Sequence, residues 1–365
     1  MKDTTTLKRR LPLPLWTLIA PVFAWLAYAG KDMGSGFFFT IVLAVALTGV
    51  VLAAVHLAEV VAHRVGEPFG TLILALAVTI IELSLIVSLM SAGGEGSAVL
   101  ARDTIFAANM IILTGIIGIC LLLGGVKFHE QFVIKHSAIS GLIALTAILI
   151  LTLVLPNYTT STPGPIYSKS QLVFVAIVCL VIYGAFVLVQ SVRHRDYFLP
   201  PGVGDENKHA IPPTNQTAII SLLLLLPCLG AVVLLAKALS PAIESGVAGI
   251  GAPKSLVGII IAMIILLPEG IAAMQAAAKN RLQTSMNLAL GSALASTGLT
   301  IPAVAIFSLF SDSNILLGID MKSILLLILS IFTVMLSLVT GRTNILYGIV
   351  LLVIFATYLF TTIVP

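Results

Sequence analysis

The sequence predicts an all-α polytopic membrane protein with about 11 transmembrane helices. Apolar residues make up 59% of its 365 residues and charged residues only 9%, against roughly 45–50% and about 25% in ordinary soluble domains. The apolar residues form continuous runs of about the 20 residues that a helix needs to cross a bilayer. Membrane β-strands are shorter and alternate apolar with polar residues. A soluble globular fold is therefore excluded.

Eleven apolar runs, each bounded by charged residues, glycine or proline, are the predicted spanning helices. They lie at about 13–29, 36–57, 70–90, 104–125, 137–155, 171–190, 217–238, 255–278, 286–310, 322–339 and 345–364. Helices are expected because they satisfy their own backbone hydrogen bonds in lipid. The first run follows three basic residues and resembles a secretory signal. We interpret it as an uncleaved helix, with cleavage as the alternative.

The basic residues predict the orientation of the chain. Thirteen of the 19 lysines and arginines fall on one side of the eleven-span arrangement and six on the other. Basic residues concentrate in short cytoplasmic loops. We therefore expect a multi-pass protein of the inner (cytoplasmic) membrane, with the N-terminus in the cytoplasm and the C-terminus on the periplasmic or extracellular side.

A polar connection rich in charge and proline divides the last ten runs into five and five. Because five is odd, two halves with one fold would be inverted relative to each other, as is common in secondary transporters. The expected organisation is a cytoplasmic N-terminus and first helix (1–35), a first five-helix repeat (36–190), a cytoplasmic linker (191–216) and an inverted second five-helix repeat (217–365).

Glu82 and Glu269 are the leading candidates for chemistry. Thirteen of the 15 acidic residues lie in loops or at the ends of runs, whereas these two lie about twelve and fourteen residues into the third and eighth runs. An ionisable group near the bilayer midplane is costly, so it is a functional candidate by default. Each glutamate lies in the second run of its half, so inversion could bring both carboxylates to one site. The alternative is a protonated, hydrogen-bonded packing residue.

Pro268 and Gly270 flank Glu269. A proline inside a helix removes one backbone hydrogen bond, so we expect the eighth helix to kink or break there. Freed carbonyls beside a carboxylate would form an all-oxygen site suited to hard cations such as Na⁺ or Ca²⁺. A kink that only shapes packing is the alternative.

Side-chain oxygens in neighbouring runs could complete such a site. Ser292, Ser296 and Thr300 recur every four residues and share one face of the ninth helix. Ser292 and Ser296 are the candidate ligands there, although small hydroxyl residues also serve close helix packing. The other candidates are Thr79, Asn109 and Thr114.

His56, Glu59, His63 and Glu67 lie at the expected cytoplasmic mouth between the second and third runs. The first three share one helical face at spacings of three and four residues. Because histidine changes its charge between pH 5 and 8, the group is a candidate sensor of internal pH. A solvated interfacial face is the alternative.

Other classes of function lack their motifs. No Walker loop, dinucleotide fingerprint, HExxH motif or nucleophile elbow occurs, so we expect no nucleotide and no cofactor. The basic residues lie at run ends and form no nucleic-acid-binding patch. Cys120, Cys179 and Cys228 each lie in an apolar run without neighbouring metal ligands and are expected to be core residues.

Several motifs resemble the calcium/cation antiporter superfamily, over nearly the whole chain. They are Gly66-Glu67-Pro68-Phe69-Gly70 before Ile81-Glu82-Leu83, the run LGGVKFHEQ at 123–131, Pro268-Glu269-Gly270 before Lys279-Asn280-Arg281-Leu282, Gly291-Ser292-Ala293, Pro302 and Gly341-Arg342-Thr343-Asn344. The resemblance implies one N-terminal helix plus two inverted five-helix repeats. It also implies one essential glutamate in each repeat, Glu82 and Glu269, which exchanges a proton for a cation.

Two departures from the superfamily pattern bear on the ion. Exchangers of calcium for protons usually carry a small-residue and amide motif after each glutamate. Here the first reads Asn109-Met110-Ile111-Ile112-Leu113-Thr114-Gly115, and in the second Ala295 stands where a glutamine is typical. Fewer side-chain oxygens favour a monovalent or mixed-ion exchanger over a selective calcium exchanger.

The sequence thus predicts a secondary cation/proton antiporter, not an enzyme, that extrudes Na⁺, K⁺ or Ca²⁺ in exchange for protons. Its expected partners are these cations, protons and the lipid bilayer. A channel or uniporter would need a continuous polar lining. An intramembrane enzyme would use the two glutamates as an acid and base pair, and a structural scaffold would leave both unexplained.

Overall fold

The computed structural model describes residues 13–31, 36–66, 76–84, 86–87, 97–198, 213–249, 251, 253, 255–311 and 315–364. Within these ranges the regular structure is helical apart from one two-stranded sheet. Nine of the described helices, some continued by a π-helical turn, are long and apolar enough to cross a membrane. The chain divides into two compact units, residues 1–74 with 212–238 and residues 75–211 with 239–365.

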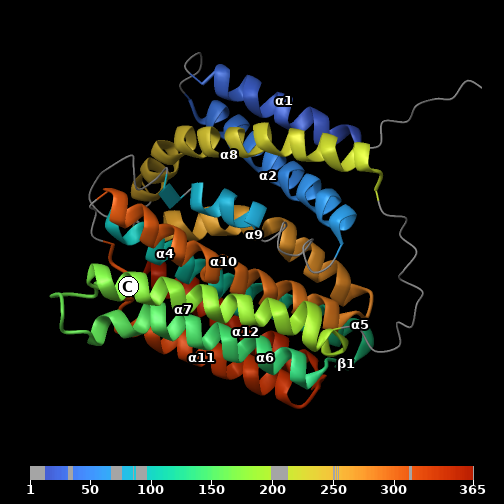
Figure 1. The fold of residues 1–365 in the computed structure, drawn as a ribbon, viewed down its shortest axis with the longest axis vertical. Helices are drawn as coiled ribbons and strands as arrows, with labels where there is room; N and C mark the ends of the chain where they lie inside the picture. The colour runs from blue at the N-terminus through green and yellow to red at the C-terminus, as the bar shows by residue number, and fades with distance from the viewer. Residues whose placement is uncertain are drawn as a thin grey trace, which may run out of the picture. The chain divides into compact units, whose positions relative to one another are not determined.

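The first unit contains α1 (Leu15–Ala29), α2 (Phe37–Val65) and the first part of α8 (Asn215–Gly249). These three helices run side by side (Figure 1). The indole Nε1 of Trp25 on α1 donates to the carbonyl of Pro227 on α8 at 3.1 Å. Helix α2 ends before Gly66, whose φ of +77° is a conformation that glycine adopts without steric strain.

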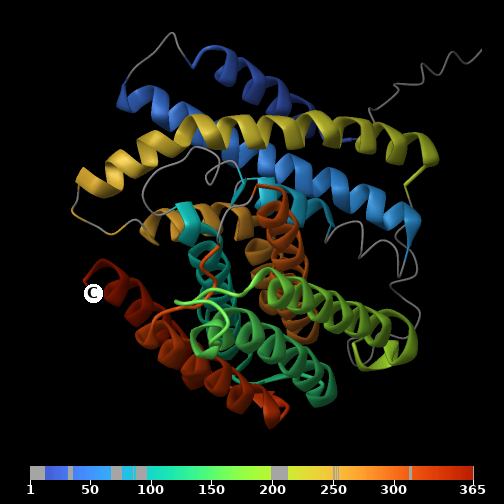
Figure 2. The ribbon, with the colours of Figure 1, turned by 60° about the vertical axis from the view of Figure 1, so that its left-hand side comes forward.

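The second unit is a helix bundle that holds all the candidate ligands. Residues 76–84 and 86–87 are helical. The remaining α-helices are α4 (Ser97–Met110), α5 (Ile117–Phe128), α6 (Lys135–Leu149), α7 (Lys169–Leu188), α9 (Ser255–Ala278), α10 (Leu282–Ser311), α11 (Met321–Val339) and α12 (Ile345–Ile363). Helices α11 and α12, drawn in red, lie side by side at one edge of the bundle (Figure 2).

Short segments of other geometry continue several helices. The π-helical turn η1 (Ile111–Ile116) joins α4 to α5, and η2 (Ile150–Val154) and η4 (Val189–Arg193) extend α6 and α7. The 3₁₀ turns are η3 (Leu155–Tyr158) and η5 (Arg195–Tyr197). π-turns inside long helices are rare overall, and those that occur often lie at functional sites. Here η1 begins two residues after Asn109.

The α4–η1–α5 segment forms the centre of the bundle. In its most apolar window 89% of the residues are buried, against 22% in α12. The close approach of α5 to α12 depends on Gly348, since a Cβ at that position would lie 2.5 Å from the backbone nitrogen of Leu122. Glycine there allows the backbones of the two helices to pack tightly.

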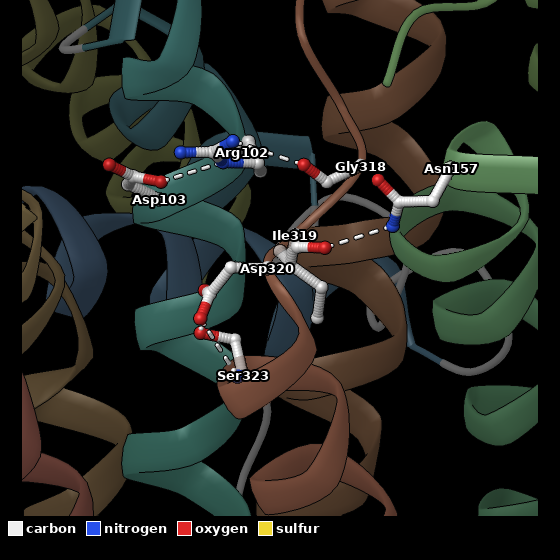
Figure 3. Close-up of polar contacts among 7 residues, drawn as sticks. All are labelled: Arg102, Asp103, Asn157, Gly318, Ile319, Asp320 and Ser323. Carbon is white, nitrogen blue, oxygen red and sulfur yellow. Dashed lines mark hydrogen bonds and ion pairs between the residues drawn. The ribbon is translucent and has the colours of Figure 1, made fainter. Parts of the chain in front are cut away.

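Polar contacts fix the segment that leads into α11 (Figure 3). Arg102 on α4 donates from Nη1 to the carbonyl of Gly318 at 3.0 Å and from Nε to Asp103 at 2.8 Å. Asn157 donates to the carbonyl of Ile319 at 2.9 Å. Asp320 caps the N-terminus of α11 by accepting a hydrogen bond from the backbone N–H of Ser323, at 3.4 Å.

The first turns of α10 are held by side-chain amides. The backbone N–H of Ile134 donates to Gln283 Oε1 at 2.7 Å, and Gln283 Nε2 donates to Ser137 at 2.9 Å. Asn287 Nδ2 donates to the carbonyl of Phe198 at 2.6 Å. Nearby, β1 (Gln131–Phe132) pairs antiparallel with β2 (Arg342–Thr343). The start of α10 is therefore anchored to neighbouring segments.

The described helices coincide with the predicted runs, with differences at their ends. Helix α9 has the predicted bounds, whereas α2 extends beyond the predicted 57 to Val65 and α8 beyond 238 to Gly249. Polar residues within the last turns of a membrane helix hide these ends from a hydropathy pattern. Asp103 and Glu244, which the sequence places in loops or at run ends, lie inside α4 and α8.

Candidate functional site

The centre of the candidate site is the carboxylate of Glu82. It is only 3% exposed and lies in the helical segment 76–84. Ser296 on α10 donates to it, with its Oγ 2.8 Å from Oε1 and 2.7 Å from Oε2. Thr300, one turn further along α10, donates to Oε2 at 3.3 Å. Two hydroxyls from one helix face thus hold a buried carboxylate.

A neighbouring face of α10 meets the helix that contains Asn109. The amide Nδ2 of Asn109 on α4 donates to Thr297 Oγ1 at 2.8 Å and to the carbonyl of Ile105 at 2.8 Å. Both Asn109 and Thr297 are fully buried. The amide oxygen Oδ1 of Asn109 is also buried, and within the described ranges it accepts no hydrogen bond. Asn109 therefore presents an oxygen with unused hydrogen-bonding capacity in the bundle interior.

Glu269 lies half-buried in the middle of α9, and its Oε2 is shielded from solvent. Of the predicted kink or break at Pro268, the break is ruled out, because the helix is continuous from Ser255 to Ala278. Tight packing supports the helix here: a Cβ on Gly270 would lie 3.3 Å from Ile116 Cδ1 in η1. Membrane helices tolerate proline when neighbouring segments compensate for the lost hydrogen bond.

The other predicted ligands have mixed surroundings. Thr79 is buried on the same helical segment as Glu82. Thr114 is buried in η1, and its hydroxyl donates to the carbonyl of Met110. Ser292 is half-buried on α10 and, within the described residues, makes no hydrogen bond to Glu82. Among the predicted ligands, Ser296 thus contacts the Glu82 carboxylate directly.

The predicted pH-sensing group lies in the first unit. His56 Nδ1 is 3.7 Å from Glu59 Oε2, and the His56 ring lies 5.4 Å from the ring of Trp16 on α1. His63 is exposed. Glu67 lies outside the described residues. The structure therefore brings two of the four predicted residues together and adds an aromatic neighbour.

Within the described ranges, no three His, Cys, Asp or Glu side chains converge as a metal cluster. Cys120, Cys179 and Cys228 are free and buried, which confirms their prediction as core residues. The chemistry available around Glu82 is therefore that of one carboxylate with hydroxyl neighbours.

Two residues of this site, Thr297 and Thr300, were absent from the predicted ligands. The recurrence of hydroxyl residues every four positions did place Thr300 on the face of Ser296. It did not reveal which helix that face meets, because that depends on tertiary packing.

Comparison with known proteins identifies the family. The family described as "Sodium/calcium exchanger protein" matches residues 33–192 and 220–364. The chain belongs to this family. It is a family of transporters and not of enzymes, and the superfamily resemblance of the motifs is confirmed.

Individual relatives of this exchanger-family chain cover most of its length. Over 364 residues, 98% of each chain, it is 43% identical to y4hA of Sinorhizobium fredii, which is named only as an ionic transporter. It is 35% identical over 322 residues, 87% of each chain, to the sodium-potassium/proton antiporter ChaA of Escherichia coli.

The fold of the chain matches that of a solved structure over nearly its whole length. The structure of native YfkE superposes with a TM-score of 0.73 at 17% identity and covers 96% of this chain and 100% of its own. The predicted all-α, multi-pass membrane architecture is thereby confirmed.

Proposed function

We propose that this protein is a secondary cation/proton antiporter that extrudes Na⁺, K⁺ or Ca²⁺ from the cytoplasm in exchange for protons. The observation that carries the proposal is the buried carboxylate of Glu82, held by Ser296 and Thr300 within a membrane-spanning bundle. A buried carboxylate that faces hydroxyls can bind either a proton or a cation. ChaA, the relative at 35% identity, is named for exchange of sodium and potassium against protons.

Competition at Glu82 and Glu269 couples the two fluxes in this proposal. A protonated carboxyl is neutral and releases the cation, whereas an ionised carboxylate inside the bilayer requires a counter-ion. Among the described residues, no lysine, arginine or histidine forms an ion pair with Glu82. The counter-charge must then come from the transported cation or proton. An empty, ionised site is too costly to reorient across the membrane, so neither ion is carried without the other.

The polar side chains near the two glutamates are the proposed supporting ligands. They are Thr79, Asn109, Thr114, Ser292 and Ser296, with Pro268 shaping the backbone beside Glu269. Asn109 is supported by its buried amide oxygen. None of these supporting side chains adds charge to that of the two glutamates, and Ca²⁺ takes six to eight oxygen ligands. The ligand set favours monovalent cations, while Ca²⁺ stays in the proposal as a further substrate.

The proposed arrangement in the membrane follows the sequence-based expectation. Residues 36–190 and 217–365 would form two inverted five-helix repeats, with the N-terminus in the cytoplasm and the C-terminus on the outer side. Labelling of single cysteines introduced at the exposed Glu130 and Tyr158 by a membrane-impermeant thiol reagent tests this. We expect labelling of position 158 from outside and of position 130 only after permeabilisation. The reverse pattern would contradict the orientation.

We also propose that His56, Glu59, His63 and Glu67 respond to internal pH. The support is the contact of His56 with Glu59 and with the ring of Trp16. Replacing His56 and His63 by glutamine removes both imidazoles while keeping polar side chains. The cytoplasmic pH dependence of exchange should then shift, and an unchanged profile would rule out this role.

The function is tested in everted membrane vesicles that hold a respiration-driven proton gradient. Na⁺, K⁺ and Ca²⁺ are added separately while a pH-sensitive dye reports the gradient. Wild type should dissipate it with at least one cation, and Glu82→Gln or Glu269→Gln should not, at equal amounts of membrane-inserted protein. Cation flux that ignores the pH gradient would instead indicate a channel or uniporter.

A further inference from the structure

Thr300 departs from the usual behaviour of a buried threonine in a helix. Such hydroxyls commonly donate to the backbone carbonyl four residues earlier. In this protein Thr152 donates to the carbonyl of Ile148 and Ser330 to that of Leu326. Thr300 is fully buried, yet its hydroxyl turns away from its own helix and donates to Glu82 at 3.3 Å.

The orientation of Thr300 completes a cluster of four side-chain oxygens. Both carboxylate oxygens of Glu82, the Ser296 hydroxyl and the Thr300 hydroxyl are joined by the hydrogen bonds of 2.7, 2.8 and 3.3 Å. All three residues are almost fully buried. A hydroxyl can donate to a carboxylate or, after rotation of its O–H bond, offer a lone pair. The same oxygens can therefore hold the empty carboxylate or surround a small cation.

We propose that Thr300 is a specificity-determining cation ligand, whose hydroxyl binds a monovalent cation together with Glu82 and Ser296. This inference rests on the proposed antiport function and adds a ligand that the motifs did not indicate. Within this cluster the Glu82 carboxylate supplies one negative charge and the two hydroxyls add neutral oxygens, a set that suits a monovalent cation. Ala295, one residue before Ser296, offers no side-chain oxygen that could enlarge the set.

The test compares Thr300→Val, which keeps the shape and loses the hydroxyl, with Thr300→Ser, which keeps the hydroxyl and loses the methyl. Thr152→Val is the matched control, because it removes a buried hydroxyl that only serves its own helix. Each purified protein is assayed for equilibrium binding of Na⁺, K⁺ and Ca²⁺. In proteoliposomes the KM and kcat for exchange are measured.

Thr300→Val should raise the KM and the dissociation constant of the monovalent substrate about tenfold or more. Thr300→Ser and Thr152→Val should stay close to wild type, and the kcat of Thr300→Val at saturating cation should be retained. Thr300→Ala, which also lacks the hydroxyl, gives the same test if Thr300→Val does not fold.

Two results would overturn the inference while the proposed function stands. The first is wild-type cation affinity in both variants that lack the hydroxyl. The second is an equal loss of affinity in Thr300→Ser and Thr300→Val, which would make the methyl group and packing responsible. Absence of any cation-driven proton flux in wild type would instead reject the proposed function, and the inference with it.

Discussion

The Ser296 hydroxyl lies 2.8 Å from one carboxylate oxygen of Glu82 and 2.7 Å from the other. These two residues are 214 positions apart in the chain. A single hydroxyl proton shared between both oxygens fixes the orientation of the carboxylate relative to α10. Because Gln283 and Asn287 tie the first turns of α10 to Ile134 and Phe198, this contact links the carboxylate to a fixed part of the bundle.

Ser296→Ala should weaken cation binding without preventing folding. Hydrogen bonds to charged groups are worth about 1.5–3 kcal/mol, so we expect roughly a tenfold to hundredfold loss of affinity. The measurement is equilibrium cation binding to purified protein. Ser330→Ala is the matched control, because Ser330 is also buried and donates to the carbonyl of Leu326. Equal affinities of Ser296→Ala and wild type would remove Ser296 from the site.

The hydrogen bond between Asn109 and Thr297 should stabilise the contact between α4 and α10. Asn109→Ala removes both bonds of its amide group and should lower the free energy of unfolding by about 1–3 kcal/mol. Denaturation in detergent measures this change. A double-mutant cycle with Thr297→Val isolates the shared bond. If the two losses of unfolding free energy simply add, the hydrogen bond between Asn109 and Thr297 does not stabilise the protein.

Gly348→Ala should separate α12 from α5. The added Cβ would lie 2.5 Å from the nitrogen of Leu122 and 2.8 Å from the carbonyl oxygen of Gly118, both backbone atoms that cannot rotate away. Overpacking of this kind costs about 1–3 kcal/mol or more. We therefore expect a lower midpoint of thermal unfolding. Gly184→Ala in α7 is the control, since a Cβ there meets no atom within 4 Å, and it should be tolerated.

Hydropathy and charge were sufficient to predict the helices and the burial of Glu82. The predicted run at 255–278 coincides with α9, and Glu82 is as deeply buried as its place in the third run implies. These features depend on local composition and on the thickness of the bilayer, both of which a sequence displays directly.

Features that depend on packing between distant segments could not be predicted. The periodicity of Ser296 and Thr300 indicated a shared face, but only the fold shows that this face meets Glu82. Helix α9 is continuous through Pro268, so the break that the sequence allowed there does not occur. No proline or glycine marks the start of the π-turn η1 at Ile111, because its glycine, Gly115, is its fifth residue.

The central claim is that a cation and a proton compete for the carboxylates of Glu82 and Glu269. Proton release on cation addition tests it most directly, measured with a pH dye on purified protein in weak buffer. Wild type and the Ser330→Ala control should release protons when a transported cation is added. Glu82→Gln should release fewer, and the double variant Glu82→Gln/Glu269→Gln none. Proton release by the double variant equal to that of wild type would contradict the mechanism.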